Sequence, residues 1–316
     1  MGLDMTDKGN TTAENTTRQA KTSARSRAQE NSQSSWFSLP QPIKRVFDRF
    51  PLVTYPANDL PQRAPGRRNE NILYIFQSED QPSRDAPSFN PSCLKWQAYL
   101  KFHGIPLRTR PSNNHASPSG SLPFLLPASQ DPQRPASPVP ASRIAKWVIS
   151  QGGKEEAVHP RQEAYTALID HNIRSAWLYY LYLDKDNFNA VAWPMYVASA
   201  STSWPVQLSL AYQLRNAARE ELLKTNTIID PQELYSQAEE AFRALSILLG
   251  ENRFFFGQTT PGLFDASLFA YTQIILDDGI EWKTPSLKTA LQRHENLVQH
   301  RARLARGFFS SRTRNT

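Results

Sequence analysis

The sequence predicts an α/β domain followed by an all-helical domain. The α/β part opens at Ile72–Phe76 (ILYIF), a continuous apolar run of strand length that suits a strand covered on both faces. A helical pattern at Asn90–Gly104 and a second strand pattern at Pro106–Arg110 complete a βαβ unit. Beyond Gly153 every long segment has helical periodicity, which favours a helical bundle for the second half.

The rest of the first domain is marked by prolines. Ser121–Pro127 (SLPFLLP) is another apolar strand pattern, entered through Leu122-Pro123. The proline-rich stretch Pro127–Pro140 is expected to be a surface insertion. Arg143–Gln151 then restores a helical pattern, which ends the first domain.

Five segments of the second domain have helical patterns. Tyr165–Leu181 carries an apolar stripe wide enough for the centre of a bundle. Asp230-Pro231-Gln232-Glu233 combines an N-cap, an N1 proline and an N3 acid, and Gly250 supplies a stop for the helix between them. The other expected helices are Trp204–Lys224, Leu263–Asp277 and Pro285–Gly307, the last with Leu287, Leu291, His294, Val298 and Ala305 on one side.

Length and composition predict a folded protein with disordered additions. The chain has 316 residues, of which 39% are hydrophobic and 11% aromatic, enough for one large core or two ordinary ones. Cys93 is the only cysteine, which excludes an internal disulfide and favours a reducing compartment. The net charge of +7 is compatible with nucleic acid, anionic lipid or an acidic partner, and the total does not choose among them.

The N-terminal region, residues 1–48, is expected to be a disordered tail with a docking arm. Between Met5 and Trp36 there is no Leu, Ile, Val, Phe or Tyr. Trp36–Tyr55 restores apolar residues, and this arm packs against its own domain or docks on a partner or a membrane. No stretch approaches the ~20 apolar residues of a spanning helix, and the N-terminus lacks the features of a secretory signal or presequence. We therefore expect a chain that does not cross a membrane by itself.

Three stretches, in order along the chain, resemble motifs of the metaxin family. Asn90–Leu94 with Tyr99–Pro106 resembles "P-x-C-L…YLKF-x-G-I-P". Gly120–Leu125 resembles "G-x-L-P-x-L". Phe254–Gly257, with Pro261, Leu263 and Asp265–Phe269, resembles "F-x-F-G-x-x-P-x-x-x-D-A-x-x-F". Each match is weak alone, but together they span about two-thirds of the chain.

The resemblance implies a glutathione-transferase-like architecture. A thioredoxin-like domain would occupy residues 49–153, with the proline-rich insertion near 127–140, and an all-helical domain residues 154–309, with a basic tail at 310–316. Within the family the chain is most similar to the fungal peripheral metaxin-like subunit of the mitochondrial sorting and assembly machinery. The larger metaxin-like subunits usually carry a C-terminal membrane segment, whereas this chain ends in a basic helix.

The same resemblance implies a non-enzymatic subunit on the cytosolic face of the mitochondrial outer membrane. Its expected partners are the membrane-embedded β-barrel insertase subunit, a second, larger metaxin-like subunit, and β-barrel precursors through their C-terminal strand signal. The alternative is a glutathione-dependent transferase or thiol reductase. A third hypothesis is a soluble redox or scaffold protein unrelated to mitochondria. No nucleic-acid partner is expected.

The thiol site that this fold implies is degenerate in the sequence. Thiol chemistry on the fold needs Ser or Cys at the N-terminus of the first helix, where free amides stabilise a thiolate. Asn90 stands at the attacking position, Ser92 could lie near a bound thiol, and Cys93 takes an inner, structural position. The cis proline that exposes backbone groups to glutathione corresponds to Pro123. The acid that would hold the γ-glutamyl group is missing near Ala141, so neither catalytic nor cofactor-binding residues are expected.

Two further features of the sequence concern the helical domain. The fold places Ser or Thr three residues before the position of Asp265, and here that residue is Gly262, a tolerable N-cap. Asp265 is therefore interpreted as a helix-start residue. Ser142 is available as an ordinary N-cap of the preceding domain's last helix. The six histidines and the single cysteine have no metal-ligand spacing, so no metal is expected.

The C-terminal end is strongly basic. From Lys283 onward eight Lys and Arg residues face one acid, Glu295. One interpretation is a solvated helix face with a frayed tail. The other is a contact with anionic lipid or with an acidic rim of the barrel subunit. The residues that would make this contact are Arg301, Arg303, Arg306, Phe308 and Phe309.

Overall fold

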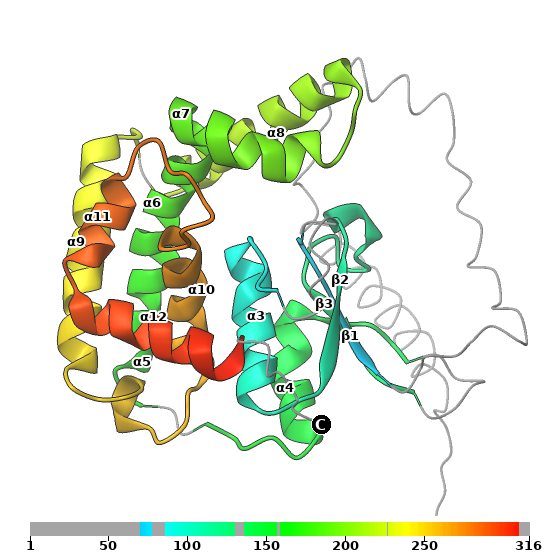
Figure 1. Ribbon diagram of the computed structural model, residues 1–316, viewed down its shortest axis with the longest axis vertical. Coiled ribbons are helices and arrows are strands. Elements are labelled where there is room, and N and C mark those ends of the chain that lie inside the picture. Colours follow the sequence, from blue (N-terminus) through cyan, green and yellow to red (C-terminus); the bar gives the residue numbers. More distant parts are fainter. Residues whose placement is uncertain (1–69, 78–85, 130–135, 157–158, 226, 310–316) are drawn as a thin grey trace, which may run out of the picture. The chain divides into compact units, whose positions relative to one another are not determined.

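The computed structural model describes residues 70–77, 86–129, 136–156, 159–225 and 227–309 (Figure 1). All of them belong to one unit, Gln62–Thr316. The predicted tail and docking arm, the middle of the proline-rich insertion, and the basic tail at 310–316 lie outside the described residues.

A four-stranded mixed sheet forms the α/β part. Its strands are β1 (Asn71–Ile75), β2 (Leu107–Pro111), β3 (Phe124–Leu126) and β4 (Val139–Pro140), in the order β2-β1-β3-β4. β1 and β2 are parallel, and β3 is antiparallel to both of its neighbours. Helix α3 (Pro91–Phe102) connects the parallel pair, so the βαβ unit is confirmed. The last two residues of the predicted insertion form β4.

The structure has helices at every predicted helical segment, although the last predicted helix is divided in two. Helix α4 (Ala141–Ser150) follows β4 and covers the sheet with α3 (Figure 1). Asp230 caps α9 by accepting a hydrogen bond from Gln232 N at 2.9 Å, and Gly250 ends it with φ +52°. The long helices of this part are α8 (Trp204–Leu223), α9 (Pro231–Leu249), α10 (Leu263–Ile275) and α12 (Glu295–Phe308).

The predicted bundle centre is a continuous helical run with two π-helical segments. It comprises α5 (Gln162–Ala167), η2 (Leu168–Ile173), α6 (Arg174–Leu178) and η3 (Tyr179–Leu183). Ile169, Ile173 and Tyr180 are fully buried along this run. After α7 (Lys185–Asn187) a third π-helical segment, η4 (Phe188–Ala198), leads towards α8. The π-helical widening was not predicted, because such segments are rare and no residue in this run marks them.

The prediction of one last helix over Pro285–Gly307 is wrong. The structure has α11 (Ser286–Gln292) and α12, separated at His294, whose backbone leaves the helical region. Just after the break, Asn296 Nδ2 donates to Ser246 O at 2.8 Å and to Gly250 O at 3.2 Å. These bonds join the start of α12 to the end of α9.

Helix α10 joins the two halves of the molecule. It packs against α3 on one side and against α12 and α11 on the other (Figure 1). Phe269, at its centre, and Leu94 and Leu100 on α3 are fully buried. Across the described residues, no helix combines the length and apolar character needed to cross a bilayer.

Candidate functional site

Asn90, at the predicted attacking position of a thiol site, carries an amide. Its Oδ1 accepts a hydrogen bond from Cys93 N at 3.2 Å, which caps α3. Its Nδ2 donates to the hydroxyl of Tyr196 at 3.3 Å. The free amides at a helix N-terminus are the groups that stabilise a thiolate. Here the side chain of Asn90 already uses one of them.

Cys93, one turn further, is a buried thiol. Its side chain is fully inaccessible, and burial raises its pKa to about 12, an effect that hydrogen bonds from Phe76 and Ser88 only partly offset. Ser92 is exposed beside it. Because the thiolate is the reactive form of cysteine, Cys93 is unsuited to nucleophilic chemistry.

We expect Cys93 in the native chain to resist a thiol reagent such as Ellman's reagent at mildly alkaline pH and to react fully in urea. The fold favours the protonated thiol, so this group contributes stability below the ordinary pKa of 9.0, and the contribution is lost as pH rises towards 12. A Ser92→Cys change in a Cys93→Ala chain is the control and should react without denaturant. Rapid labelling of native Cys93 would contradict the inert thiol.

The backbone donor next to the cis proline is also engaged. The Leu122-Pro123 peptide bond is cis. Leu122 N donates to Asn114 Oδ1 at 3.0 Å, and Asn114 opens the short 3-10 turn Asn114–Ala116. This is the position at which the resemblance implies backbone pairing with a cysteinyl peptide. Here the side chain of Asn114 already engages the N–H of Leu122.

No acid stands at the start of α4. The first turn of α4 contains no Asp or Glu, and the N-cap is Pro140, without a side-chain hydrogen bond. The prediction of Ser142 as N-cap is therefore wrong, because the helix already begins at Ala141 and Ser142 is its second residue. A γ-glutamyl group would find no side chain here to hold it.

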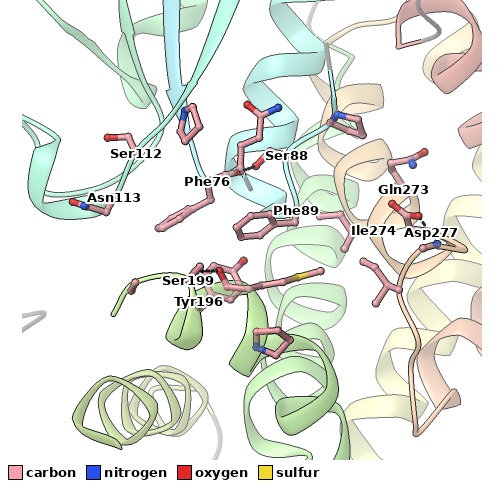
Figure 2. Close-up of a pocket in the computed structure, with 18 residues that line it drawn as sticks. Phe76, Ser88, Phe89, Ser112, Asn113, Tyr196, Ser199, Gln273, Ile274 and Asp277 are labelled. Atoms are coloured by element: carbon pink, nitrogen blue, oxygen red, sulfur yellow. Dashed lines mark hydrogen bonds between the residues drawn. The ribbon is translucent and has the colours of Figure 1, made fainter. Parts of the chain in front are cut away.

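A cavity of about 990 Å³ lies beside the start of α3 (Figure 2). One wall is aromatic: the rings of Phe76 and Tyr196 are 5.5 Å apart, and those of Phe89 and Tyr196 are 5.1 Å apart, both edge to face. Ser112 and Asn113, just after β2, line a second side. Figure 2 shows the aromatic rings gathered between the ends of the strands and the helical part.

The end of α10 supplies the third side of the cavity. Gln273, Ile274 and Asp277 line it, and the Oε1 atom of Gln273 is buried without a hydrogen-bond partner among the described residues. Burial raises the pKa of Tyr196 well above its ordinary value, so the phenol stays protonated. An aromatic wall with a few polar groups and no activated nucleophile suits binding.

Sequence reasoning missed Tyr196, Asn114 and Gln273. Tyr196 is 106 positions from Asn90, and no motif marks it. In the described part of the chain, no three His, Cys, Asp or Glu residues are placed to hold a metal ion.

A polar cluster fixes the start of α10. Asp265 accepts hydrogen bonds from Gly262 N at 3.0 Å and Phe255 N at 3.2 Å, and its Oδ1 lies 2.8 Å from Nε2 of the fully buried His300. Glu156 accepts from Leu263 N at 2.8 Å. A carboxylate distant in sequence thus provides the capping that Gly262 cannot. The sequence marked Asp265 and Gly262, but neither His300 nor Glu156.

The arginines predicted to touch a membrane or partner also have partners within the fold. Arg301 donates to Leu276 O at 2.9 Å and Arg303 to Arg253 O at 3.2 Å. Arg306 is exposed.

The two phenylalanines of that predicted surface pack inward. The Phe308 ring lies 4.6 Å from that of Phe102, and the Phe309 ring 5.4 Å from that of Phe269. These contacts hold α12 against α3 and α10. Membrane or partner contact by this segment stays a prediction, and Arg306 is its most exposed member.

Three family models match parts of the chain. The glutathione S-transferase N-terminal domain matches residues 91–187, and the glutathione S-transferase C-terminal domain matches residues 238–304. The family described as SAM35, subunit of the SAM complex, matches residues 37–93.

The individual relatives described next are metaxins. Metaxin-3 of Xenopus laevis is 29% identical over 221 residues, which cover 66% of this chain and 67% of that protein. The "Mitochondrial outer membrane import complex protein METAXIN" of Arabidopsis thaliana is 24% identical over 78% of this chain and 76% of its own length. Glutathione transferase GSTFuA2 from Phanerochaete chrysosporium superposes with a TM-score of 0.47 at 18% identity, over 76% of this chain and 98% of the transferase. The chain is thus similar to metaxins over about two-thirds of its length, and its two matched domains and element order give it a glutathione-transferase-like fold.

Proposed function

We propose that this chain is a non-enzymatic subunit of the mitochondrial outer-membrane sorting and assembly complex, peripheral on the cytosolic face. The SAM35 match and the name of the Arabidopsis relative support the location and the complex. Non-enzymatic use is supported by the thiol site: Asn90 and Asn114 engage its backbone donors, and Cys93 is buried and protonated. The engagement of these two donors and the burial of the Cys93 thiol are the observations that carry the proposal.

The proposed partners are the membrane-embedded β-barrel subunit, a second, larger metaxin-like subunit, and β-barrel precursors. A precursor would be held through its C-terminal strand signal. Extended segments are recognised by backbone pairing together with pockets for alternate side chains. The cavity lined by Phe76, Phe89 and Tyr196 has the aromatic wall that an apolar side chain needs.

Affinity purification of the tagged chain from a mild-detergent extract of mitochondria tests the assembly. Recovery of an integral β-barrel protein together with a second metaxin-like chain is the expected result. A Phe89→Ser variant should keep the barrel subunit and lose precursor if the cavity holds the strand signal. Recovery of the chain without a barrel partner, or absence of the chain from the mitochondrial fraction, would overturn the proposal.

The chain is expected not to bind immobilised glutathione. The Leu122 N–H is already bonded to Asn114, and no acid stands at the start of α4 to receive the γ-glutamyl group. Retention is measured on a glutathione column, with an authentic transferase as the positive control. Specific elution of this chain by free glutathione would favour the transferase or reductase alternative.

A further inference from the structure

Helix α8 has a second apolar face that no described element covers. Its buried residues, Ala211, Ala218 and Leu222, pack towards η3, η4 and α6. Trp204 and Tyr212 are 67% and 70% exposed. Figure 1 shows α8 at the periphery of the helices, at the top of the view, away from α12.

The exposed apolar residues form one stripe along the helix. Trp204, Leu208 and Tyr212 follow each other at four-residue spacing, which places them on one side of an α-helix. Leu223, the last residue of α8, is also exposed and extends this apolar surface to the C-terminal end of the helix. A helix of 20 residues is about 30 Å long, so the stripe presents a long, straight surface.

Acidic residues are absent beside most of the stripe, and the acid nearest its C-terminal end, the exposed Glu220, accepts a hydrogen bond from Asn216 at 2.7 Å. No Asp or Glu occurs between Asp186 and Glu220, so the first four turns of α8 carry no acid. Arg219 is exposed on the side of the stripe, and Arg215 is partly buried, with its guanidinium 5.3 Å from the Phe188 ring centre. Glu221, on another side, is engaged by Arg174 at 2.8 Å and Lys224 at 2.6 Å.

We infer that this face of α8 lies in the interfacial layer of a lipid bilayer and so attaches the chain to its membrane. Trp and Tyr favour the boundary between headgroups and acyl chains, and a helix with an apolar face bearing them lies in the plane of the membrane. The inference rests on the proposed peripheral location. It assigns lipid contact to α8, whereas Phe308 and Phe309 pack inside the fold.

Flotation of the purified full-length chain with vesicles tests the inference. The vesicles contain phosphatidylcholine and phosphatidylethanolamine, with or without phosphatidylinositol. A triple variant, Trp204→Ser, Leu208→Ser and Tyr212→Ser, should bind both kinds of vesicle at least about tenfold more weakly than the wild type, because three exposed apolar side chains are removed. Arg219→Glu should weaken binding about fivefold or more, and only to vesicles that contain phosphatidylinositol.

Ile247→Ser is the matched control. Ile247 is 75% exposed on α9, so this variant removes an equally accessible apolar side chain from another surface and should float like the wild type. Acyl-brominated vesicles give a second readout that does not need the triple variant to fold. Brominated acyl chains should quench the tryptophan fluorescence of the wild type more than that of the Trp204→Phe variant, which lacks the tryptophan of the stripe.

Three results would overturn the inference: no flotation of the wild type, equal flotation of the triple variant, or equal loss with Ile247→Ser. A triple variant that floats normally but no longer copurifies with the barrel subunit would make the face a protein interface. That result would leave the proposed function intact. A chain that floats as expected but recovers no barrel partner would instead overturn the proposed function alone.

Discussion

Asp265→Ala is expected to lower the free energy of unfolding by about 3 kcal/mol or more. The carboxylate accepts from Gly262 N and Phe255 N and lies 2.8 Å from His300 Nε2, all within a buried site. Alanine would leave these polar groups without partners, and each buried polar group that loses its partner costs about 1–3 kcal/mol. The effect should also loosen α12, because His300 belongs to it.

Urea unfolding followed by far-ultraviolet circular dichroism measures this loss. Asp265→Asn keeps one acceptor and should cost less than alanine. Asp278→Ala is the control, because that carboxylate is 97% exposed and its pair with Lys288, at 3.6 Å, is at the surface. Equal stability of Asp265→Ala and Asp278→Ala would show that the buried cluster does not hold α10 and α12 together.

Glu156→Ala and Gly262→Ala are each expected to cost about 1–2 kcal/mol, through one shared interaction. Glu156 accepts from Leu263 N at 2.8 and 3.0 Å through its two oxygens. A Cβ atom at Gly262 would lie 2.6 Å from Glu156 Oε2, so alanine would push the carboxylate away from this amide. Either change therefore removes the same cap of α10.

A double-mutant cycle separates this coupling from independent losses. The double variant should lose clearly less than the sum of the two single losses, because the second change has no cap left to remove. Gly262→Ser should be milder than Gly262→Ala, since a serine hydroxyl can cap the helix itself. Additive losses in unfolding experiments would show that Gly262 and Glu156 act separately.

Local signals predicted most helix starts and stops correctly. Asp230, Pro231 and Gly250 act as cap, first residue and stop of α9, because each acts on backbone groups within four positions. The final helix was predicted without its break, and the bonds of Asn296 to Ser246 and Gly250 just after that break join residues about 50 positions apart.

In the candidate site, too, the sequence identified the residues of local motifs but not the contacts that they make in the folded chain. Asn90, Ser92, Cys93 and Pro123 could be named from their places in a motif. Their contacts could not be predicted: Asn114 reaches Leu122 within the connection between β2 and β3, and Tyr196 reaches Asn90 from η4, 106 positions away. The lined cavity and the unpartnered Oε1 of Gln273 likewise arise from segments distant in sequence.

The sequence by itself determined the order of the α/β and helical parts and the absence of a nucleophile at Asn90. Periodicity, capping and residue chemistry are local, so they can be read along the chain. Only the tertiary structure decided that Phe308 and Phe309 pack inward and that the stripe with Trp204 and Tyr212 remains uncovered. Which apolar surface is buried depends on long-range packing, since each helix has more than one face that a neighbour can cover.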